Sequence, residues 1–171
     1  MIEKIYKYSY DRRTIFFSIL YILLFSTVAV SIAILSDGSY FTAWFISIVG
    51  AIVALMILSI PRQIVLNEEN LTIKCVLEIA QIPLEEIVSV SRVEPQDRKW
   101  VLPIFGSFGF FGYFGYFVDW RTLEKVTIYA TEWQNMIEIV NIYDDRYYIS
   151  CRDIDQFIAH IDSYFERSEE V

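Results

Sequence analysis

The chain has 171 residues, of which 55% are hydrophobic, and its formal net charge is −8. An apolar content this high excludes an ordinary single soluble domain, so part of the chain is expected to leave water. The acidic charge repels phosphates and therefore excludes generic nucleic-acid binding.

Two apolar runs near the N-terminus predict membrane spans. Residues 14–35 form 22 consecutive positions without a charge, and residues 40–60 form another 21. Either run is long enough to cross a hydrocarbon core of about 30 Å as a helix. Because only residues 36–39 separate them, the two are expected to form an antiparallel hairpin. A secretory signal peptide cleaved near Ala33 is the alternative for the first run, and the second run argues against it.

The basic residues near these runs predict the orientation of the hairpin. They lie before the first run and directly after the second, at Lys4, Lys7, Arg12, Arg13 and Arg62. Cationic flanks stay in the cytoplasm, so both termini are expected inside and Asp37 outside. Tyr6, Tyr8 and Tyr10 are expected near the inner interface. The predicted parts are a cytoplasmic N-terminal segment (1–13), a transmembrane helical hairpin (14–60) and a cytoplasmic domain (61–171), which places the protein in the cytoplasmic (inner) membrane.

The spans contain none of the residue types that line ion or proton routes. Asp, Glu, Lys, Arg and His are all absent from residues 14–35 and 40–60. Small residues recur along both runs instead, which predicts close packing either within one hairpin or between two chains of a homo-oligomer.

The region from Pro61 onward has the size of one domain and is strongly acidic. It carries ten basic and 19 acidic side chains, a net charge of −9. That charge disfavours a broad grip on anionic lipid, although Arg98 and Lys99 form a local exception. Cys75 and Cys151 have no histidine partner in sequence and are expected to be reduced thiols, not metal ligands.

The hydrophobic pattern of this region predicts strands and then a helix. Seven short antiparallel strands are expected in the segments RQIVL, LTIKCVL, EIAQIPL, VSVSRV, KVTIYAT, NMIEIVN and RYYIS. A stripe with helical spacing follows at Ile154, Phe157, Ile158, Ile161 and Phe165. The fold class expected is a membrane α-helical hairpin joined to a mainly β (α+β) domain. In that domain the strands form an open barrel capped by a C-terminal amphipathic helix.

Catalytic patterns are missing from the sequence. His160 is the single histidine and is expected on the solvent-facing flank of the last helix. The acidic pairs Glu85-Glu86 and Asp144-Asp145 fall in predicted turns, where solvated side chains are the simpler interpretation. The glycines at 106, 109, 112 and 115 lack the spacing of a phosphate-binding loop. A non-enzymatic protein without catalytic residues, cofactor or metal is expected.

The segment FGSFGFFGYFGYF, residues 105–117, holds four of the six glycines between aromatic residues. Three interpretations are open: a strand connection that folds onto its own sheet, a loop that dips into the inner headgroup layer, or a contact surface for another chain. In the second, basic residues nearby would meet lipid phosphates. The candidate membrane or partner contacts are Trp100, Phe105, Phe108, Phe110, Phe111, Tyr113, Phe114, Tyr116, Phe117, Arg98, Lys99 and Arg121.

Seven strands closed by one C-terminal helix correspond to the pleckstrin-homology plan. The whole chain resembles bacterial PH-like domain proteins with two N-terminal transmembrane helices. The resemblance lies in RQIVLNEENLTI, IPLEEI, FGSFGFFGYFGYF and YYISCRDIDQFI. It implies a membrane-tethered PH-like module and supplies no catalytic residue and no established ligand.

Two functions are therefore compatible with the sequence. The first is a membrane-anchored PH-like module that binds or scaffolds a protein or lipid partner at the inner face of the bacterial membrane. The alternative is an auxiliary subunit of a larger transport or secretion complex, held through its transmembrane hairpin.

Overall fold

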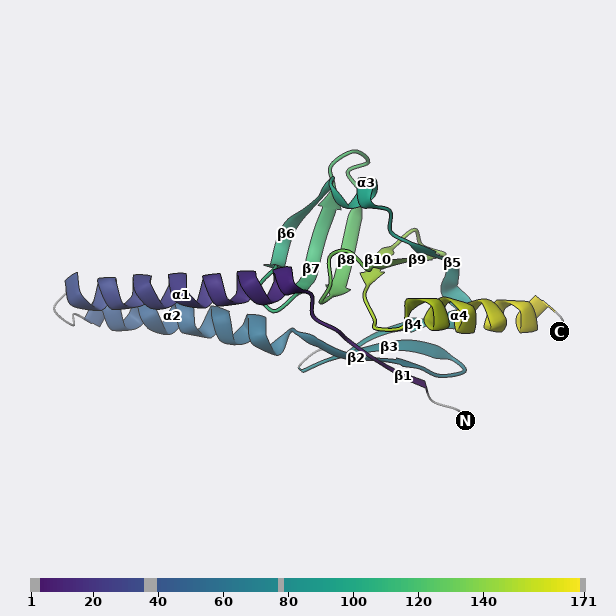
Figure 1. Cartoon of the computed structure of the whole chain (residues 1–171), viewed down its shortest axis with the longest axis horizontal. Coiled ribbons are helices and arrows are strands. Elements are labelled where there is room, and N and C mark those ends of the chain that lie inside the picture. The colour runs from purple at the N-terminus through teal and green to yellow at the C-terminus, as the bar shows by residue number, and fades with distance from the viewer. Residues whose placement is uncertain (1–3, 36–39, 77–78, 170–171) are drawn as a thin grey trace.

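The structure is a computed structural model that describes residues 4–35, 40–76 and 79–169. Two long helices extend to one side of a domain made of two sheets and a C-terminal helix (Figure 1). The segment expected on the outer face, residues 36–39, lies outside the described residues.

Helices α1 (Arg12–Leu35) and α2 (Tyr40–Leu58) form a helical hairpin. Asp11 caps the first, because its Oδ1 accepts a hydrogen bond from the backbone N of Thr14 at 2.6 Å. Among the described residues, α1 is the one helix long and apolar enough to cross a membrane. The second predicted span is not confirmed, because the apolar stretch described in α2, Thr42–Leu58, is shorter than the roughly 20 residues that a membrane-spanning helix needs.

A four-stranded antiparallel sheet contains a strand that sequence reasoning missed. Its order is β1-β2-β3-β4, with β1 (Lys4–Lys7), β2 (Pro61–Leu66), β3 (Asn70–Cys75) and β4 (Ile79–Pro83). Tyr6 of β1 lies opposite Ile64 of β2 and is buried, with its ring edge-on to Phe157 at 5.2 Å between centroids. Residues 4–7 are thus part of the sheet, and Tyr6 is a core residue instead of an interfacial one.

The chain changes sheet at the 3-10 turn η1 (Leu84–Glu86). The second sheet has the order β5-β9-β10-β8-β7-β6. Its strands are β5 (Ile87–Arg92), β6 (Val101–Phe108), β7 (Tyr113–Asp119), β8 (Lys125–Ala130), β9 (Ile137–Asn141) and β10 (Arg146–Ile149), and α3 (Pro95–Arg98) precedes β6. The β9–β10 hairpin inserts β10 beside β8 in parallel, so the expectation of purely antiparallel pairing was wrong.

The strands therefore form two sheets and not one closed barrel. The seven predicted strands correspond to β2–β5 and β8–β10, while β1, β6 and β7 are additional. Mostly antiparallel sheets followed by a C-terminal helix are confirmed as the architecture of the domain.

Helix α4 (Ile154–Glu169) completes the main core. Phe157 and Ile161 are fully buried in a cluster that draws on both sheets, as the predicted apolar stripe requires. A second cluster lies on the other face of the six-stranded sheet, around Phe117, Ile128 and Met136. His160 is half-buried and hydrogen-bonds Lys4 and Tyr6, so its predicted solvent-facing position was wrong; the missed strand β1 covers it.

Candidate functional site

The glycine-aromatic segment is a β-hairpin, not a long connection. Strands β6 and β7 pair from Val101↔Asp119 to Phe108↔Tyr113, and the turn closes with Gly109 N donating to Gly112 O at 2.9 Å. Inside the hairpin, Ser107 Oγ donates to Phe110 O at 2.7 Å.

Two of the glycines face each other across this hairpin. Gly106 and Gly115 are register partners with φ of +139° and +113°. A β-carbon on Gly106 would lie 2.1 Å from Phe114 O, and one on Gly115 would lie 2.4 Å from Phe105 O. Glycine is therefore required at both positions because the two backbones approach too closely for any side chain.

The structure divides the aromatic candidates into two groups. Phe110, Tyr113, Phe114 and Phe117 are buried, and Phe111 is half-buried. The exposed aromatic residues are Trp100, Phe105, Phe108 and Tyr116. The Phe108 ring nevertheless packs against the Trp133 ring, with 5.1 Å between the ring centroids. The exposed group supplies surface that remains available to lipid or to a partner.

The tip of the hairpin packs against the first helix. The Phe110 ring lies edge-on to Tyr21 at 6.0 Å and to Phe25 at 6.3 Å between centroids. The Phe111 backbone N donates to Ser18 Oγ at 2.8 Å. The sheet and α1 therefore form one packed unit at this point.

A second polar contact lies one turn earlier on α1. Thr14 Oγ1 donates to Thr131 O at 3.0 Å, and Thr14 and Ser18 are the buried residues of the helix. Thr14 and Ser18 lie at i and i+4, but Thr27 and Ser31 repeat that spacing on the same helix, so the sequence gives only a partial signal for this contact.

An apolar cleft of about 500 Å³ lies between the end of α2 and strands β6–β8. One wall is formed by Ile52, Leu55 and Met56 of α2. The other includes Phe105, Phe114 and Tyr116 of the hairpin. This volume is within the range of about 300–1,000 Å³ typical of small-molecule sites.

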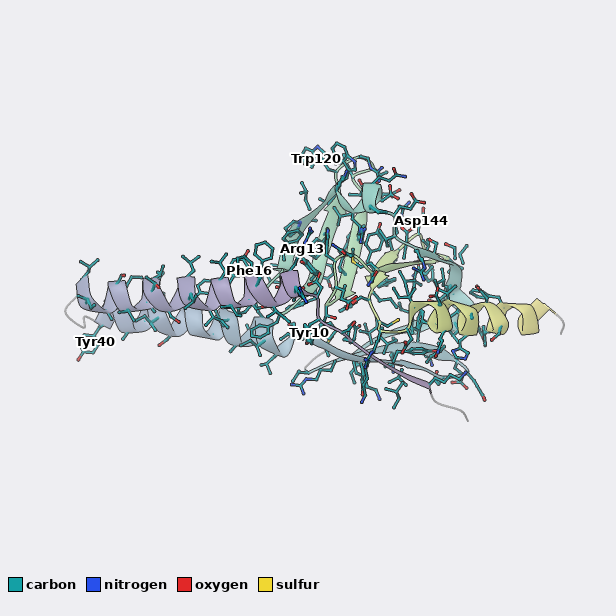
Figure 2. The ribbon with its side chains drawn as sticks, viewed as in Figure 1. Tyr10, Arg13, Phe16, Tyr40, Trp120 and Asp144 are labelled. Atoms are coloured by element: carbon teal, nitrogen blue, oxygen red, sulfur yellow. The ribbon has the colours of Figure 1, made fainter. Side chains whose placement is uncertain are left out.

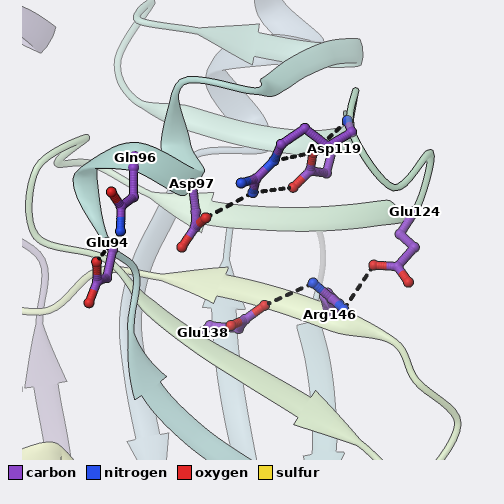
Figure 3. A network of polar contacts seen from close by, with 8 residues as sticks. Glu94, Gln96, Asp97, Asp119, Glu124, Glu138 and Arg146 are labelled. Atoms are coloured by element: carbon purple, nitrogen blue, oxygen red, sulfur yellow. Dashed lines mark hydrogen bonds and ion pairs between the residues drawn. The ribbon is translucent and has the colours of Figure 1, made fainter.

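The predicted phosphate contacts are mostly engaged with the protein itself. Arg98 is buried and donates Nη1 to Trp133 O at 2.6 Å, and burial lowers its pKa. Arg121 lies between Asp97, at 2.8 Å, and Asp119, at 3.1 Å (Figure 3). Lys99 is exposed. The structure thus places two of the three cations in internal polar contacts.

Asp119 shows how firmly this pairing is held. Burial acts to raise the pKa of its carboxyl, but hydrogen bonds from the Arg121 side chain and backbone outweigh burial and hold the pKa below the ordinary value. Asp119 therefore remains ionised, and the Arg121 guanidinium stays bound to it.

A second ion-pair group lies on the neighbouring strands. Arg146 contacts Glu124 at 2.8 Å and Glu138 at 3.6 Å (Figure 3). Burial raises the pKa of Glu138, with the Arg146 charge acting against that shift. Each arginine of this polar surface faces carboxylates, so the surface lacks the excess positive charge that an anion site needs.

The described residues provide no group of His, Cys, Asp and Glu side chains that could hold a metal ion. Cys75 and Cys151 are buried and not disulfide-bonded, and burial raises the pKa of Cys151 to about 12. A thiol with that pKa stays protonated, which is the opposite of a reactive cysteine.

Comparison with known proteins agrees with the fold. A family model described as Bacterial PH domain matches residues 62–164, so β1 and both long helices lie outside the match. No curated protein and no solved structure matches the chain significantly. PH domains are generally non-catalytic modules that bind proteins or lipids. The chain belongs to the Bacterial PH domain family.

Proposed function

We propose that this protein is a non-enzymatic PH module anchored in the bacterial inner membrane by the α1–α2 hairpin, with its domain in the cytoplasm. Its partner is the inner leaflet itself, which the exposed aromatic edge of the six-stranded sheet contacts. The proposed organisation keeps the predicted parts 1–13, 14–60 and 61–171. Strand β1, which lies in the first part, pairs with β2 and so belongs to the four-stranded sheet of the domain.

The exposure of the helices supports membrane anchoring. In the most apolar window of α1 only 6% of residues are buried. Ile48, Ile52 and Leu55 of α2 are exposed as well. Apolar surface on this scale is not stable in water, and a bilayer covers it.

The observation that carries the proposal is the exposed edge strand β6. Ile104 and Phe105 are 64% and 77% exposed, and Leu102 and Phe108 are exposed too. Figure 1 shows β6 on the side of the sheet toward which the helices extend, with α4 on the opposite side. An apolar edge strand in water invites aggregation, whereas one that lies against lipid is covered.

The junction between helices and domain supports the cytoplasmic orientation. Arg13 and Tyr10 lie at this junction (Figure 2), and Arg62 is the second residue of β2, the first element after α2. Cations at that level meet the anionic headgroups of the inner leaflet. Cleavage of a signal peptide would remove β1 and the buried Tyr6, which argues against that alternative.

The test measures whether β6 contacts lipid in the full-length protein. Ile104→Cys is introduced with both native cysteines changed to Ala and is labelled with an environment-sensitive fluorophore. The protein is then placed in phosphatidylcholine–phosphatidylglycerol vesicles. We expect a blue-shifted emission that lipids with nitroxide-labelled acyl chains quench, because the residue lies against the bilayer.

Ile142→Cys is the matched control. Ile142 is 58% exposed and lies in the β9–β10 connection, where Figure 2 labels Asp144 away from the helices. Its label should remain unquenched. Equal quenching at the two positions, or none at residue 104, would contradict the proposal. A stoichiometric chain that co-purifies through the helices would then favour the auxiliary-subunit function.

A further inference from the structure

The cleft between α2 and the six-stranded sheet exists because the side chains of α2 and of the β6–β7 hairpin do not fill the space between them. The core shared by both sheets includes Tyr129 of β8 but no residue of β6 or β7. Among the residues that the structure describes, α2 supplies the helical wall of the cleft, and the side-chain-free pair Gly106 and Gly115 lines the space. The result is a cavity of about 500 Å³ that is bounded by a long apolar helix on one side.

The chemistry of the lining selects a hydrocarbon. None of the described side chains that line the cleft is charged, and its walls are dominated by aliphatic and aromatic groups from α2 and β6–β8. The Ser59 hydroxyl is used within the helix, because it donates to Leu55 O at 3.0 Å. The lining also carries the hydroxyls of Tyr116, Thr127 and Tyr129, but a peptide segment would bring a backbone N–H and C=O for each residue into this mainly apolar space, whereas an acyl chain brings no such group.

We propose that one acyl chain of an inner-leaflet phospholipid occupies this cleft. The inference rests on the proposed membrane anchoring and deepens it by naming the ligand. Ile52 and Leu55 line the cleft and are also exposed on the face of α2 that lies in lipid, so a chain enters sideways without crossing water.

A cation lies at one edge of the cleft. The Lys125 ammonium is 4.0 Å from the centroid of the Tyr116 ring, and Tyr116 lines the cleft. A cation held over an aromatic ring at that edge suits the phosphate of a lipid whose chain lies inside. The bound lipid would then connect the helix hairpin to the sheet of the PH domain.

Photocrosslinking of the full-length protein tests this assignment. The chain is reconstituted in phosphatidylcholine–phosphatidylglycerol vesicles that contain phosphatidylglycerol with a diazirine near the end of one acyl chain. After illumination, peptides are mapped by mass spectrometry. Crosslinks at Phe114 of β7 and Thr127 of β8 are expected, because Phe114 is buried, Thr127 is half-buried and both line the cleft, so that an acyl chain reaches them from the cleft.

A matched pair of variants shows whether the cleft is responsible. Leu55→Trp places a large ring in the cleft and should remove the crosslinks on β7 and β8. Ile57→Trp adds the same ring at an exposed position two residues later that does not line the cleft, and should keep them. Crosslinks along α1 and α2 should persist in both variants.

Three results would overturn the assignment. Crosslinks confined to α1 and α2 in the unchanged protein would leave the anchor intact and the cleft without lipid. Equal loss in both Trp variants would show that the signal does not come from the cleft. A Thr127→Cys variant that forms a disulfide-linked dimer in the vesicles would assign the cleft to a second copy. Release of the protein by alkaline carbonate would instead contradict the membrane anchoring itself.

Discussion

The inner strands of the four-stranded sheet and the edge strand β6 of the six-stranded sheet bury their apolar side chains to very different extents. In the four-stranded sheet, Ile64, Leu71 and Ile73 are fully buried, because α4 and the facing strands of the other sheet cover them. In the six-stranded sheet, β6 is the terminal strand, and it leaves Leu102, Ile104 and Phe105 exposed. The inner strands β2 and β3 belong to the core of the domain, whereas the edge strand β6 presents apolar surface to its surroundings.

This difference separates residues that maintain the fold from residues that contact something else. Phe157 and Phe105 are the same amino acid, yet one is fully buried and the other is 77% exposed. Composition alone does not distinguish them. Their substitution should therefore affect different properties, and the following predictions test that separation.

The largest effect is expected for Phe157→Ala. Removing a fully buried phenylalanine leaves a cavity between the sheets and costs about 3–5 kcal/mol of unfolding free energy. Phe105→Ala is the control and should change it by no more than about 0.5 kcal/mol. Chemical denaturation of the full-length protein in detergent micelles measures the unfolding free energy of both variants. Similar losses of unfolding free energy would show that other parts of the protein cover β6.

A smaller effect is expected inside the hairpin, for Gly115→Ala. The new β-carbon would approach Phe105 O to 2.4 Å at a φ of +113°, which strains the backbone by about 1–3 kcal/mol. Gly50→Ala in α2 is the matched control, since apart from the neighbouring residues of its own helix no atom of the described residues lies within 4 Å of its β-carbon position. Thermal unfolding should show a lower midpoint for the first variant alone. An unchanged midpoint would mean that the strand pair opens at little cost.

The smallest effect is expected for Ser18→Ala, which tests the link between α1 and the hairpin tip. It removes the oxygen that accepts the Phe111 N–H at 2.8 Å, at a cost of about 0.5–1.5 kcal/mol. Ser47→Ala on α2 is the control, because it removes a hydroxyl that donates to Ala43 O at 2.8 Å within the same helix. Hydrogen exchange of the Phe111 amide should accelerate in Ser18→Ala and not in Ser47→Ala. Equal exchange rates in the two variants would show that the Ser18–Phe111 hydrogen bond does not hold the hairpin tip to α1.

The sequence predicted the elements whose signals are local. Alternating residues such as Leu71 and Ile73 marked β3, and the spacing of Phe157 and Ile161 marked α4, because each pattern needs only its own segment. Strand β1 was missed because four residues before an apolar helix carry little periodicity. Its partner β2 lies beyond the whole helical hairpin.

The sequence predicted which residues belong to the candidate site, but not how their side chains are placed relative to one another. Alternation along β7 places Tyr113 and Phe117 on one face and Tyr116 on the other, and the glycines between them obscure that pattern in sequence. The role of Arg98 was not predictable, because its partner Trp133 meets it only in the folded domain. For Arg121, the pairing with Asp119 two residues earlier was a local signal, whereas the contact with Asp97 was not.

The pairing of β1 with β2 also constrains how many times the chain crosses the bilayer. Lys4 lies opposite Leu66 and Lys7 opposite Gln63, so the residues before α1 and those after α2 belong to one sheet. Two neighbouring strands of a sheet must be on the same side of a membrane. The number of crossings between them is therefore even, whatever the flanking charges are. A chain in which α1 crosses the membrane must cross it again before Pro61. Strand β2 can pair with β1 only once this second crossing has brought it back to the same side.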